Sequence, residues 1–482
     1  MTKLLNNIRF KFEYLAHKKF FNEIYVAIFA AITVICWKFN SMLGLEIFLG
    51  ALFLVVVFLD DLKYAIPILI FFLFNINFGF ANNEVPKIII YLVADVVLCL
   101  VYFTIKSGIH LKKMKSFIPL LGLSISQIIP IFWTAITVEY ALYYIYFANL
   151  LYLVYYVVIV NGIKKGSLDI LATTMSYLGV LVACQCIIKV YEIKPPIEEL
   201  LNMWYYLGWG LCNEAGIMIC LSIPFSFYLI SKASQARIMF LHNLKIVISI
   251  AGIILTTSRG SYLCGFSETI VLYIVTFILS KEKFKYFNFI VYFFSILLIT
   301  IAIFGNDSIK FYNDIIEKVF VRDLDDNGRV VLWKRAYELF NQSPKTIAFG
   351  PGIVAEITDV GSAYGNQPGW VAYHSTFFET MAMGGIIGLF FLGWHFASHY
   401  SNMIFTNKRF MVIIGIGSLF IDAYGMIDNS YYMYYYMLPL CVILACIDSK
   451  IYDRTQIDWQ SLKTEKKSPL PKGARGFEII WL

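Results

Sequence analysis

Three side chains along this sequence have the chemistry to handle a phosphorylated substrate: Arg259, Arg329 and His374. The guanidinium group of arginine stays charged in proteins and binds phosphate oxygens in a planar fork. Histidine is the side chain best suited to moving a proton near neutral pH. The three residues therefore fit a site that holds a phosphate group and transfers a proton, provided that the fold brings them to one surface.

The segment after position 327 has the pattern of an amphipathic helix. Its apolar side chains recur at helical spacing, at Val330, Trp333, Tyr337 and Phe340. Asp326 or Asn327 can cap its start, and Pro344 limits its length. Arg329 then lies in the first turn, where the helix dipole is already positive, so this end of the helix favours an anion. The alternative, a solvated arginine on a loop, stays open at this point.

The composition is that of a membrane protein. Hydrophobic residues make up 59% of the 482 residues, charged residues make up 15%, and the mean hydropathy is +0.71. Apolar runs of about 18 residues or more can cross a hydrocarbon layer of about 30 Å. Such runs fall near 22–37, 42–59, 64–80, 88–105, 117–137, 140–160, 170–190, 210–230, 244–257, 262–280, 286–304, 376–397, 410–427 and 430–447. We therefore predict an all-α polytopic membrane protein of about 12–14 transmembrane helices.

The positive charges indicate which loops face the cytoplasm. Lysine and arginine residues gather in alternate loops and in the C-terminal tail, whereas the intervening loops are neutral or acidic. By the positive-inside rule both termini are cytoplasmic. The net charge of +7 is explained by this distribution, so it gives no reason to expect nucleic-acid binding. One long loop faces outward, and a loop of that length is usually functional.

The topology divides the chain into five regions. They are N-terminal transmembrane helices (1–209), transmembrane helices with an outer-face Ser-Arg-Gly element (210–304), a large extracytoplasmic loop containing the short amphipathic helix (305–373), C-terminal transmembrane helices (374–449) and a polar cytoplasmic tail expected to be disordered (450–482). In this topology Arg259, Arg329 and His374 all lie at the outer surface of the membrane. Together they would suit a phosphorylated lipid head group.

Two patterns that could indicate a metal are weak. Residues 323–328 begin like a calcium-binding loop, but Lys334 occupies the position where that loop needs a bidentate glutamate. The nine cysteines lie in apolar stretches, with no CxxC pair and no His/Cys ligand spacing. We therefore expect no metal site, no disulfide and no cofactor.

Four groups of residues together resemble the O-antigen polymerase/O-antigen ligase superfamily of bacterial envelope enzymes. Asn213-Glu214-Ala215, with Pro224 downstream, is similar to that family's Asn-rich segment start, and Thr257-Ser258-Arg259-Gly260 is similar to its Ser-Arg-Gly element. Gly328-Arg329 with Trp333, Phe340, Pro344, Gly350 and Gly352 follows its outer-loop pattern. His374-Ser375, followed by Gly385 and Gly388, matches its His-(Asn/Ser/Gln) motif, in which Asn is the commoner second residue. The resemblance covers about 210–390.

The resemblance implies a metal-independent, inverting glycosyl transfer at the outer face of the bacterial cytoplasmic (inner) membrane. The donor would be an undecaprenyl-pyrophosphate-linked oligosaccharide. Arg259 and Arg329 would hold the pyrophosphate, and His374 would orient or deprotonate the acceptor hydroxyl. Glu379, Glu214, Asn213 and Ser375 are candidates for positioning the sugar.

The favoured function is polymerisation of O-antigen or capsular polysaccharide repeat units, with the lipid-linked oligosaccharide, the phospholipid bilayer, a chain-length regulator and a flippase as partners. Two alternatives within the same class and one from another class stay open. Within the class they are an O-antigen ligase that transfers the finished glycan to the lipid A-core of lipopolysaccharide, and an enzyme that transfers the glycan to a protein acceptor. The third is a transporter or flippase of lipid-linked glycans, because acidic residues in apolar segments, at Glu46, Asp95 and Glu268, are candidates for function by default.

Overall fold

The computed structural model of the 482-residue chain describes residues 19–59, 61–77, 85–102, 106, 108–133, 148–164, 167–196, 199, 203–280, 282–283, 313–317, 329–352, 373–404, 411–428, 430–431 and 433–465. All regular secondary structure in these ranges is helical, and the one extended pairing is an isolated bridge between Tyr206 and Leu211. The predicted all-α class is confirmed for this part of the chain.

Five of the described helices are long and apolar enough to cross a membrane. They are α9 (Ser167–Ile193), α11 (Cys212–Lys232), α12 (Ala236–Leu255), α13 (Arg259–Leu279) and α17 (Thr376–Ile404). Shorter apolar helices add to them at Leu43–Phe58, Leu62–Asn75, Phe117–Phe132, Tyr152–Gly162 and Met411–Ile427. These findings confirm a polytopic membrane protein. The predicted segment 286–304 lies outside the described residues.

Most of the remaining helices overlap predicted apolar segments, whereas Leu111–Lys113, Arg329–Phe340 and Pro344–Phe349 lie outside them. The remaining helices are α2 (Lys19–Lys38), α3 (Leu43–Phe58), α4 (Ile66–Phe71) between the 3-10 turns η1 (Leu62–Ala65) and η2 (Phe72–Asn75), α5 (Val85–Tyr102), η4 (Leu111–Lys113), α6 (Phe117–Ile128) followed by η5 (Ile129–Phe132), α8 (Ala148–Gly162), α15 (Arg329–Phe340), α16 (Pro344–Phe349), α18 (Met411–Ile427) and α19 (Tyr434–Glu465). The last helix runs to Glu465, so the boundary that we expected at 449/450 falls inside a helix, and the first part of the expected disordered tail is helical.

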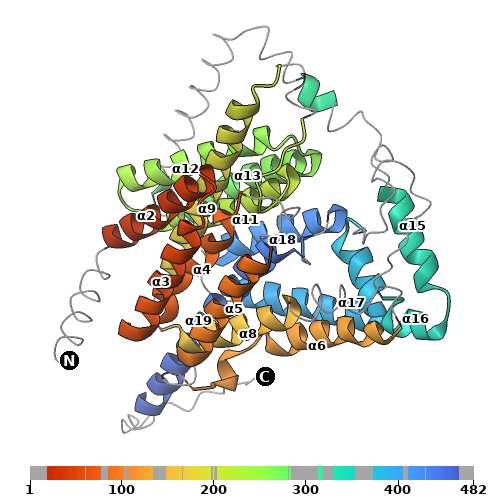
Figure 1. Ribbon diagram of the computed structural model, residues 1–482. Helices are drawn as coiled ribbons and strands as arrows, with labels where there is room; N and C mark the ends of the chain where they lie inside the picture. The colour runs from red at the N-terminus through yellow and green to blue at the C-terminus, as the bar shows by residue number, and fades with distance from the viewer. Residues whose placement is uncertain are drawn as a thin grey trace.

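Helix α11 lies at the centre of the bundle, packed against α9, α12, α13 and α18 (Figure 1). Small residues allow these close approaches, as they commonly do between membrane helices. A Cβ atom on Gly216 would lie 1.7 Å from the hydroxyl of Ser261 on α13, and one on Gly417 of α18 would lie 1.9 Å from Pro224 on α11. Neither glycine could be replaced without separating the helices that it joins.

Helices α15 and α16 lie at one edge of the bundle beside α17 (Figure 1). Leu332, Ala336 and Phe340 of α15 are buried in a small apolar cluster against α17. The amphipathic helix is therefore present, but its buried face is rotated from the one that we expected, because Tyr337 is 58% exposed. The expected caps, Asp326 and Asn327, lie outside the described residues.

Glycines set the contact between α16 and α17. Gly385 has a left-handed φ of +60° that interrupts α17, and Gly350 has a φ of +84° at the end of α16. A Cβ atom on Gly350 would lie 2.3 Å from the carbonyl oxygen of Ala382, and one on Gly385 would lie 2.5 Å from the carbonyl carbon of Ala348. Two of the glycines that carry the family resemblance are therefore required by backbone packing.

Candidate active site

Asp428 brings Arg329 and His374 together. It is the first residue after α18 and is 8% exposed. The Arg329 guanidinium, from the first turn of α15, donates a hydrogen bond to the carbonyl oxygen of Ile427 and lies 3.3 Å from Oδ2 of Asp428. Nδ1 of His374 lies 3.4 Å from Oδ1 of the same carboxylate. Two of the three predicted site residues therefore share one acid, which the sequence analysis did not single out.

The cluster is open on one side. The side chain of Arg329 is 22% exposed and that of His374 is 30% exposed, whereas that of Asp428 is 12% exposed. A carboxylate facing Nδ1 favours the tautomer with a proton on that atom, which leaves Nε2 as the acceptor nitrogen. An Asp–His pair arranged in this way can orient an imidazole and stabilise it once it takes up a proton.

The backbone of Tyr373 fixes the position of His374. Trp333, one turn after Arg329 on α15, donates its indole Nε1–H to the Tyr373 carbonyl at 2.9 Å and stacks on Phe378. Oε2 of Glu379 accepts the Tyr373 N–H at 2.8 Å. Burial and the nearby Glu379 carboxylate raise the pKa of the Tyr373 phenol, so this neighbour of His374 stays protonated at neutral pH.

Glu379 and Ser375 are placed differently from our expectation. Both are buried, at 0% and 1% exposure. Glu379 accepts a backbone N–H, and Oγ of Ser375 accepts the N–H of Phe378 at 3.4 Å at the start of α17. In this arrangement their atoms hold the turn that carries His374, which favours a positioning role over direct contact with a sugar.

Arg259 is connected to this cluster through α18. It begins α13, where the preceding Ser258 caps the helix by accepting the N–H of Ser261. The hydroxyl of Tyr424 lies 3.0 Å from Oγ of Ser258 and 2.9 Å from Oγ of Ser261. Tyr424 precedes Asp428 by one helical turn, so the start of α13 contacts α18 one turn before the acid that Arg329 and His374 share. The side chain of Arg259 is half-buried there.

Glu214 and Asn213 lie at the same end of the bundle, at the start of α11. Glu214 accepts the backbone N–H of Leu211 and is near enough to Asp428 for their charges to interact. The carbonyl oxygen of Asn213 lies 3.5 Å from the hydroxyl of Tyr424. Both side chains are partly exposed.

The backbone is strained at two motif positions. Thr257, just before Ser258-Arg259, has φ of +55°, and His374 has φ of +50°. A left-handed conformation is rare for a residue other than glycine and is a genuine outlier for β-branched threonine. Such strain persists only where the surroundings enforce it, and it gathers at functional sites. Here Oγ1 of Thr257 donates to the carbonyl oxygen of Met203 at 2.8 Å, which holds the turn in place.

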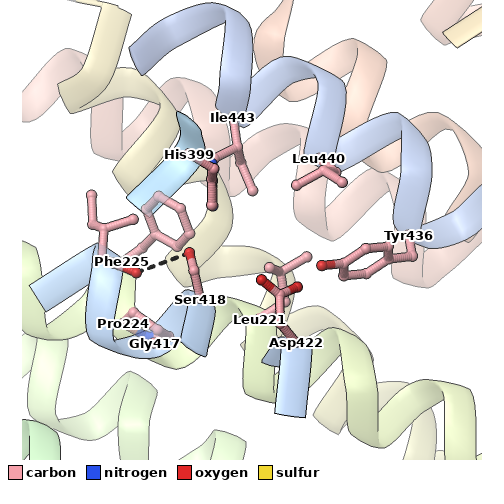
Figure 2. A pocket seen from close by; sticks show the side chains of 11 residues that line it. Leu221, Pro224, Phe225, His399, Gly417, Ser418, Asp422, Tyr436, Leu440 and Ile443 are labelled. Atoms are coloured by element: carbon pink, nitrogen blue, oxygen red, sulfur yellow. Dashed lines mark hydrogen bonds between the residues drawn. The ribbon is translucent and has the colours of Figure 1, made fainter. Parts of the chain in front are cut away.

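A second polar cluster lies deeper, where α17, α18 and α19 meet. Tyr400 donates to the Asp422 carboxylate, and Nε2 of His395 lies 3.2 Å from the hydroxyl of Tyr431. Figure 2 shows Asp422 and Tyr436 facing each other across a small pocket that His399 also lines. His395 and His399 are buried, at 0% and 3% exposure, so this cluster has no open face like that of His374.

Sequence analysis missed Asp428 because it concentrated on acids within apolar segments. Asp428 lies just past the end of such a segment, at the end of α18 that the predicted topology places outside. Tyr424 offered no comparable indication, since it is one of 33 tyrosines and only its hydrogen bonds distinguish it. A search for outward-facing acids at the ends of apolar segments would have found Asp428.

Comparison with known proteins gives one match. Residues 244–393 match a family model described as O-antigen ligase. The matched segment contains Arg259, Arg329 and His374, whereas Glu214 and Asp428 lie outside it. The match confirms the resemblance to the O-antigen polymerase/ligase superfamily and supports a function of that general, glycosyl-transferring type. No curated protein and no solved structure matches the chain.

Proposed function

We propose that the protein transfers a glycan from an undecaprenyl-pyrophosphate-linked oligosaccharide at the outer face of the cytoplasmic membrane, and so polymerises O-antigen or capsular polysaccharide repeat units. The observation that carries this proposal is the sharing of the Asp428 carboxylate by Arg329 and His374. A base and an anion-binding group are thereby held side by side on a partly exposed surface. Transfer from a pyrophosphate needs both groups.

In the proposed reaction His374 acts on the acceptor. Its Nε2 takes the proton of the acceptor hydroxyl while the hydroxyl oxygen attacks the anomeric carbon of the donor sugar. Asp428, on the opposite side of the imidazole, orients the ring and stabilises its protonated form. The bond between the anomeric carbon and the pyrophosphate oxygen breaks in the same displacement, so the configuration at that carbon inverts.

The two arginines act on the leaving group. The electron pair of the broken bond passes to the pyrophosphate, whose growing charge Arg329 and Arg259 would offset. Within the described residues, the contacts of Arg329 with Ile427 and Asp428 occupy only part of its five N–H donors, and the others would bind phosphate oxygens. Since a pyrophosphate is already a good leaving group and the arginines supply positive charge, the proposed reaction requires no metal ion.

An O-antigen ligase is the second candidate, because the matching family model carries that description. A ligase would use the same donor and the same three side chains, and would differ in transferring the glycan to lipid A-core. A flippase for lipid-linked glycans is the rival of another class. It would need a site near the middle of the bilayer, whereas Arg329, Asp428 and His374 gather at the helix ends.

Glycan length in a deletion strain tests the proposal. The strain is complemented with wild type, His374→Ala, Arg259→Ala or Arg329→Ala, and the surface glycan is separated on gels. We expect wild type to restore a ladder of lengths, whereas each variant, expressed to the same level, leaves a single repeat. Matched controls are Arg335→Ala on α15, which lies near Glu338, and His110→Ala, whose side chain is exposed. Both should behave as wild type.

The same experiment separates the alternatives. Long polymer stranded on the lipid carrier in the deletion strain would identify a ligase. Unpolymerised repeats trapped on the cytoplasmic side would identify a flippase. Full ladders from all three site variants would refute the proposed site. With purified protein and lipid-linked donor, transfer that continues in excess chelator would support metal independence of the reaction.

A further inference from the structure

Two thiols and a carboxylate converge between α11 and α13, away from the Asp428 cluster. The Sγ atoms of Cys220 and Cys264 and a carboxylate oxygen of Glu268 all lie within 4.8 Å of one another. The three side chains are buried, at 0%, 8% and 0% exposure. Within the described residues no other group of three His, Cys, Asp or Glu side chains comes as close together.

The carboxylate of Glu268 has no hydrogen-bond partner for either oxygen within the part of the chain that the structure describes. An unsatisfied buried polar group is unfavourable by about 1–3 kcal/mol, and more when it is charged. Glu268 is therefore a fully buried polar side chain without a hydrogen-bond partner in the described residues, and the two thiols lie within 4.8 Å of its carboxylate. A buried acid without a hydrogen-bond partner is unfavourable, so its presence here suggests that it binds something.

The backbone geometry favours ligation. Cys264 and Glu268 are separated by four residues on α13, so both project from one face of that helix toward α11. On α11, Pro224 has no N–H to donate to the carbonyl of Cys220, so that helical bond is missing beside the cluster. Gly417 of α18 leaves room next to the acid, because a Cβ atom there would lie 3.0 Å from Oε1 of Glu268. Gly417 and Pro224 also line the small pocket drawn in Figure 2.

We propose that Cys220, Cys264 and Glu268 bind a thiophilic divalent cation of the Zn²⁺ class, which fixes α11 to α13. Thiolate sulfur and carboxylate oxygen are both ordinary zinc ligands. With the two thiols and the acid deprotonated the ligands carry three negative charges, so a dication leaves one and a monocation leaves two. In an apolar bundle the dication is the better match. The carbonyl oxygen of Phe420, 3.2 Å from Sγ of Cys264, lies near enough to contribute to the shell.

The site would be structural. Cys264 and Glu268 lie five and nine residues after Arg259, which corresponds to about 8–14 Å along the helix. That depth separates the ion from reacting groups at the helix ends, so it takes no part in glycosyl transfer. It would join the helix that begins at Arg259 to the helix that carries Asn213 and Glu214. Sequence analysis expected no metal because it searched for short ligand spacings, whereas these ligands come from two helices.

Metal analysis of the full chain purified in detergent from zinc-containing medium tests the proposal. We expect about one zinc per chain in wild type. Loss of an outer-shell partner alone lowers metal affinity by about 10–100-fold, so Cys220→Ser/Cys264→Ser should empty the site and Glu268→Gln should weaken it. The matched control is Cys441→Ser/Cys446→Ser, which removes two equally buried cysteines from α19 and should keep the metal.

X-ray absorption at the zinc edge gives a second measurement that needs no substitution, in case a variant fails to fold. Two sulfur neighbours at about 2.3 Å and oxygen at about 2.0–2.2 Å would support the site. Three results would each overturn it: wild type that takes up no zinc after incubation with the ion, a zinc shell without sulfur, or a Cys220–Cys264 disulfide in peptide mass spectra. Wild-type protein that binds zinc but transfers no glycan from the lipid-linked donor would count against the proposed function and would leave the metal site standing.

Discussion

The described residues include two polar clusters that each contain a histidine and an aspartate, and the two clusters differ in their surroundings. In the first, His374 faces Asp428 at the end of α18, with Arg329 on the same carboxylate and part of each side chain exposed. In the second, His395 and Asp422 are buried among tyrosines between α17, α18 and α19. Asp422 and Asp428 come from one stretch of chain six residues apart, yet one acid meets a cation and the other meets phenols.

The two clusters differ in whether their histidine can exchange a proton with a bound molecule. A histidine with a free, exposed nitrogen and an acid behind it can exchange a proton with a bound molecule. His395 is buried among tyrosines, and its Nε2 has a neutral partner in the Tyr431 hydroxyl, whereas its Nδ1 has no hydrogen-bond partner among the described residues. Residue type therefore does not distinguish a reactive site from a structural network. The two clusters are distinguished by the exposure of the histidine and by the charge of the side chains around the aspartate, and substitutions can alter both.

No other substitution is expected to lower transfer more than His374→Ala. Loss of a general base lowers the rate by about 10²–10⁴-fold, while the fold should hold because the backbone of Tyr373 keeps its two partners. The measurement is the rate of transfer by purified protein with lipid-linked donor, at equal protein amounts. A rate within about twofold of wild type would show that His374 is not the general base, and the Asp428 cluster would then have no better claim to catalysis than the buried one.

Paired amide substitutions of the two aspartates test the comparison directly. Asp428→Asn keeps the shape but removes the charge that orients His374 and holds Arg329, so transfer should fall by about 10²–10⁴-fold at unchanged protein level. Asp422→Asn exchanges an acceptor among tyrosines, so its effect should appear in thermal stability, with transfer per folded molecule kept. The two variants are compared by rate and by thermal unfolding of the same preparations. If Asp422→Asn also abolished transfer without loss of stability, the buried cluster would belong to the mechanism.

Much of the fold could be predicted from the sequence, because transmembrane helices are set by local hydropathy. Thirteen of the fourteen expected segments lie wholly or partly in described residues, and their described parts overlap α-helices or short α-helices continued by 3-10 turns. Local pattern did not fix the rotation of α15, since Tyr337 and Leu332 are both apolar and only contact with α17 decides which is buried. Helix α19 ran past its apolar part because nothing in the sequence before Glu465 breaks it.

The site could be predicted only in part, for a related reason. Arg259, Arg329 and His374 have side chains that are conspicuous in an apolar chain, so residue type and topology were enough to select them. Asp428 acquires its role from long-range contacts, with partners 99 and 54 residues away in the chain. Glu379 was selected as a candidate sugar ligand because it is near His374 in the sequence. In the structure its carboxylate is buried and accepts the backbone N–H of Tyr373. Contacts of that kind depend on tertiary packing, which periodicity does not describe.

Trp333→Phe should give a moderate effect by loosening the turn that carries His374. The phenyl ring can keep the stack on Phe378, but the hydrogen bond to the Tyr373 carbonyl is lost, a change of about 0.5–1.5 kcal/mol. We expect transfer to fall by about two- to tenfold, through the rate constant rather than through donor binding. The check is a comparison of kcat and KM with those of Tyr337→Phe, an exposed position on the same helix. An equal effect of both substitutions would show that α15 does not position His374 through Trp333.

Tyr431→Phe should have the smallest effect, and for that reason it tests the buried cluster most sharply. The substitution removes one hydroxyl, 3.2 Å from Nε2 of His395, and leaves the ring contacts with Phe396 and Tyr436. If the cluster only stabilises the bundle, the melting temperature should fall by about 1–3 °C and the transfer rate should not change. A rate that fell while the melting temperature stayed constant would mean that His395 communicates with the surface cluster along α17 or α18. In that case burial alone would not show that a histidine cluster is purely structural, and both clusters would have to be included in the mechanism of transfer.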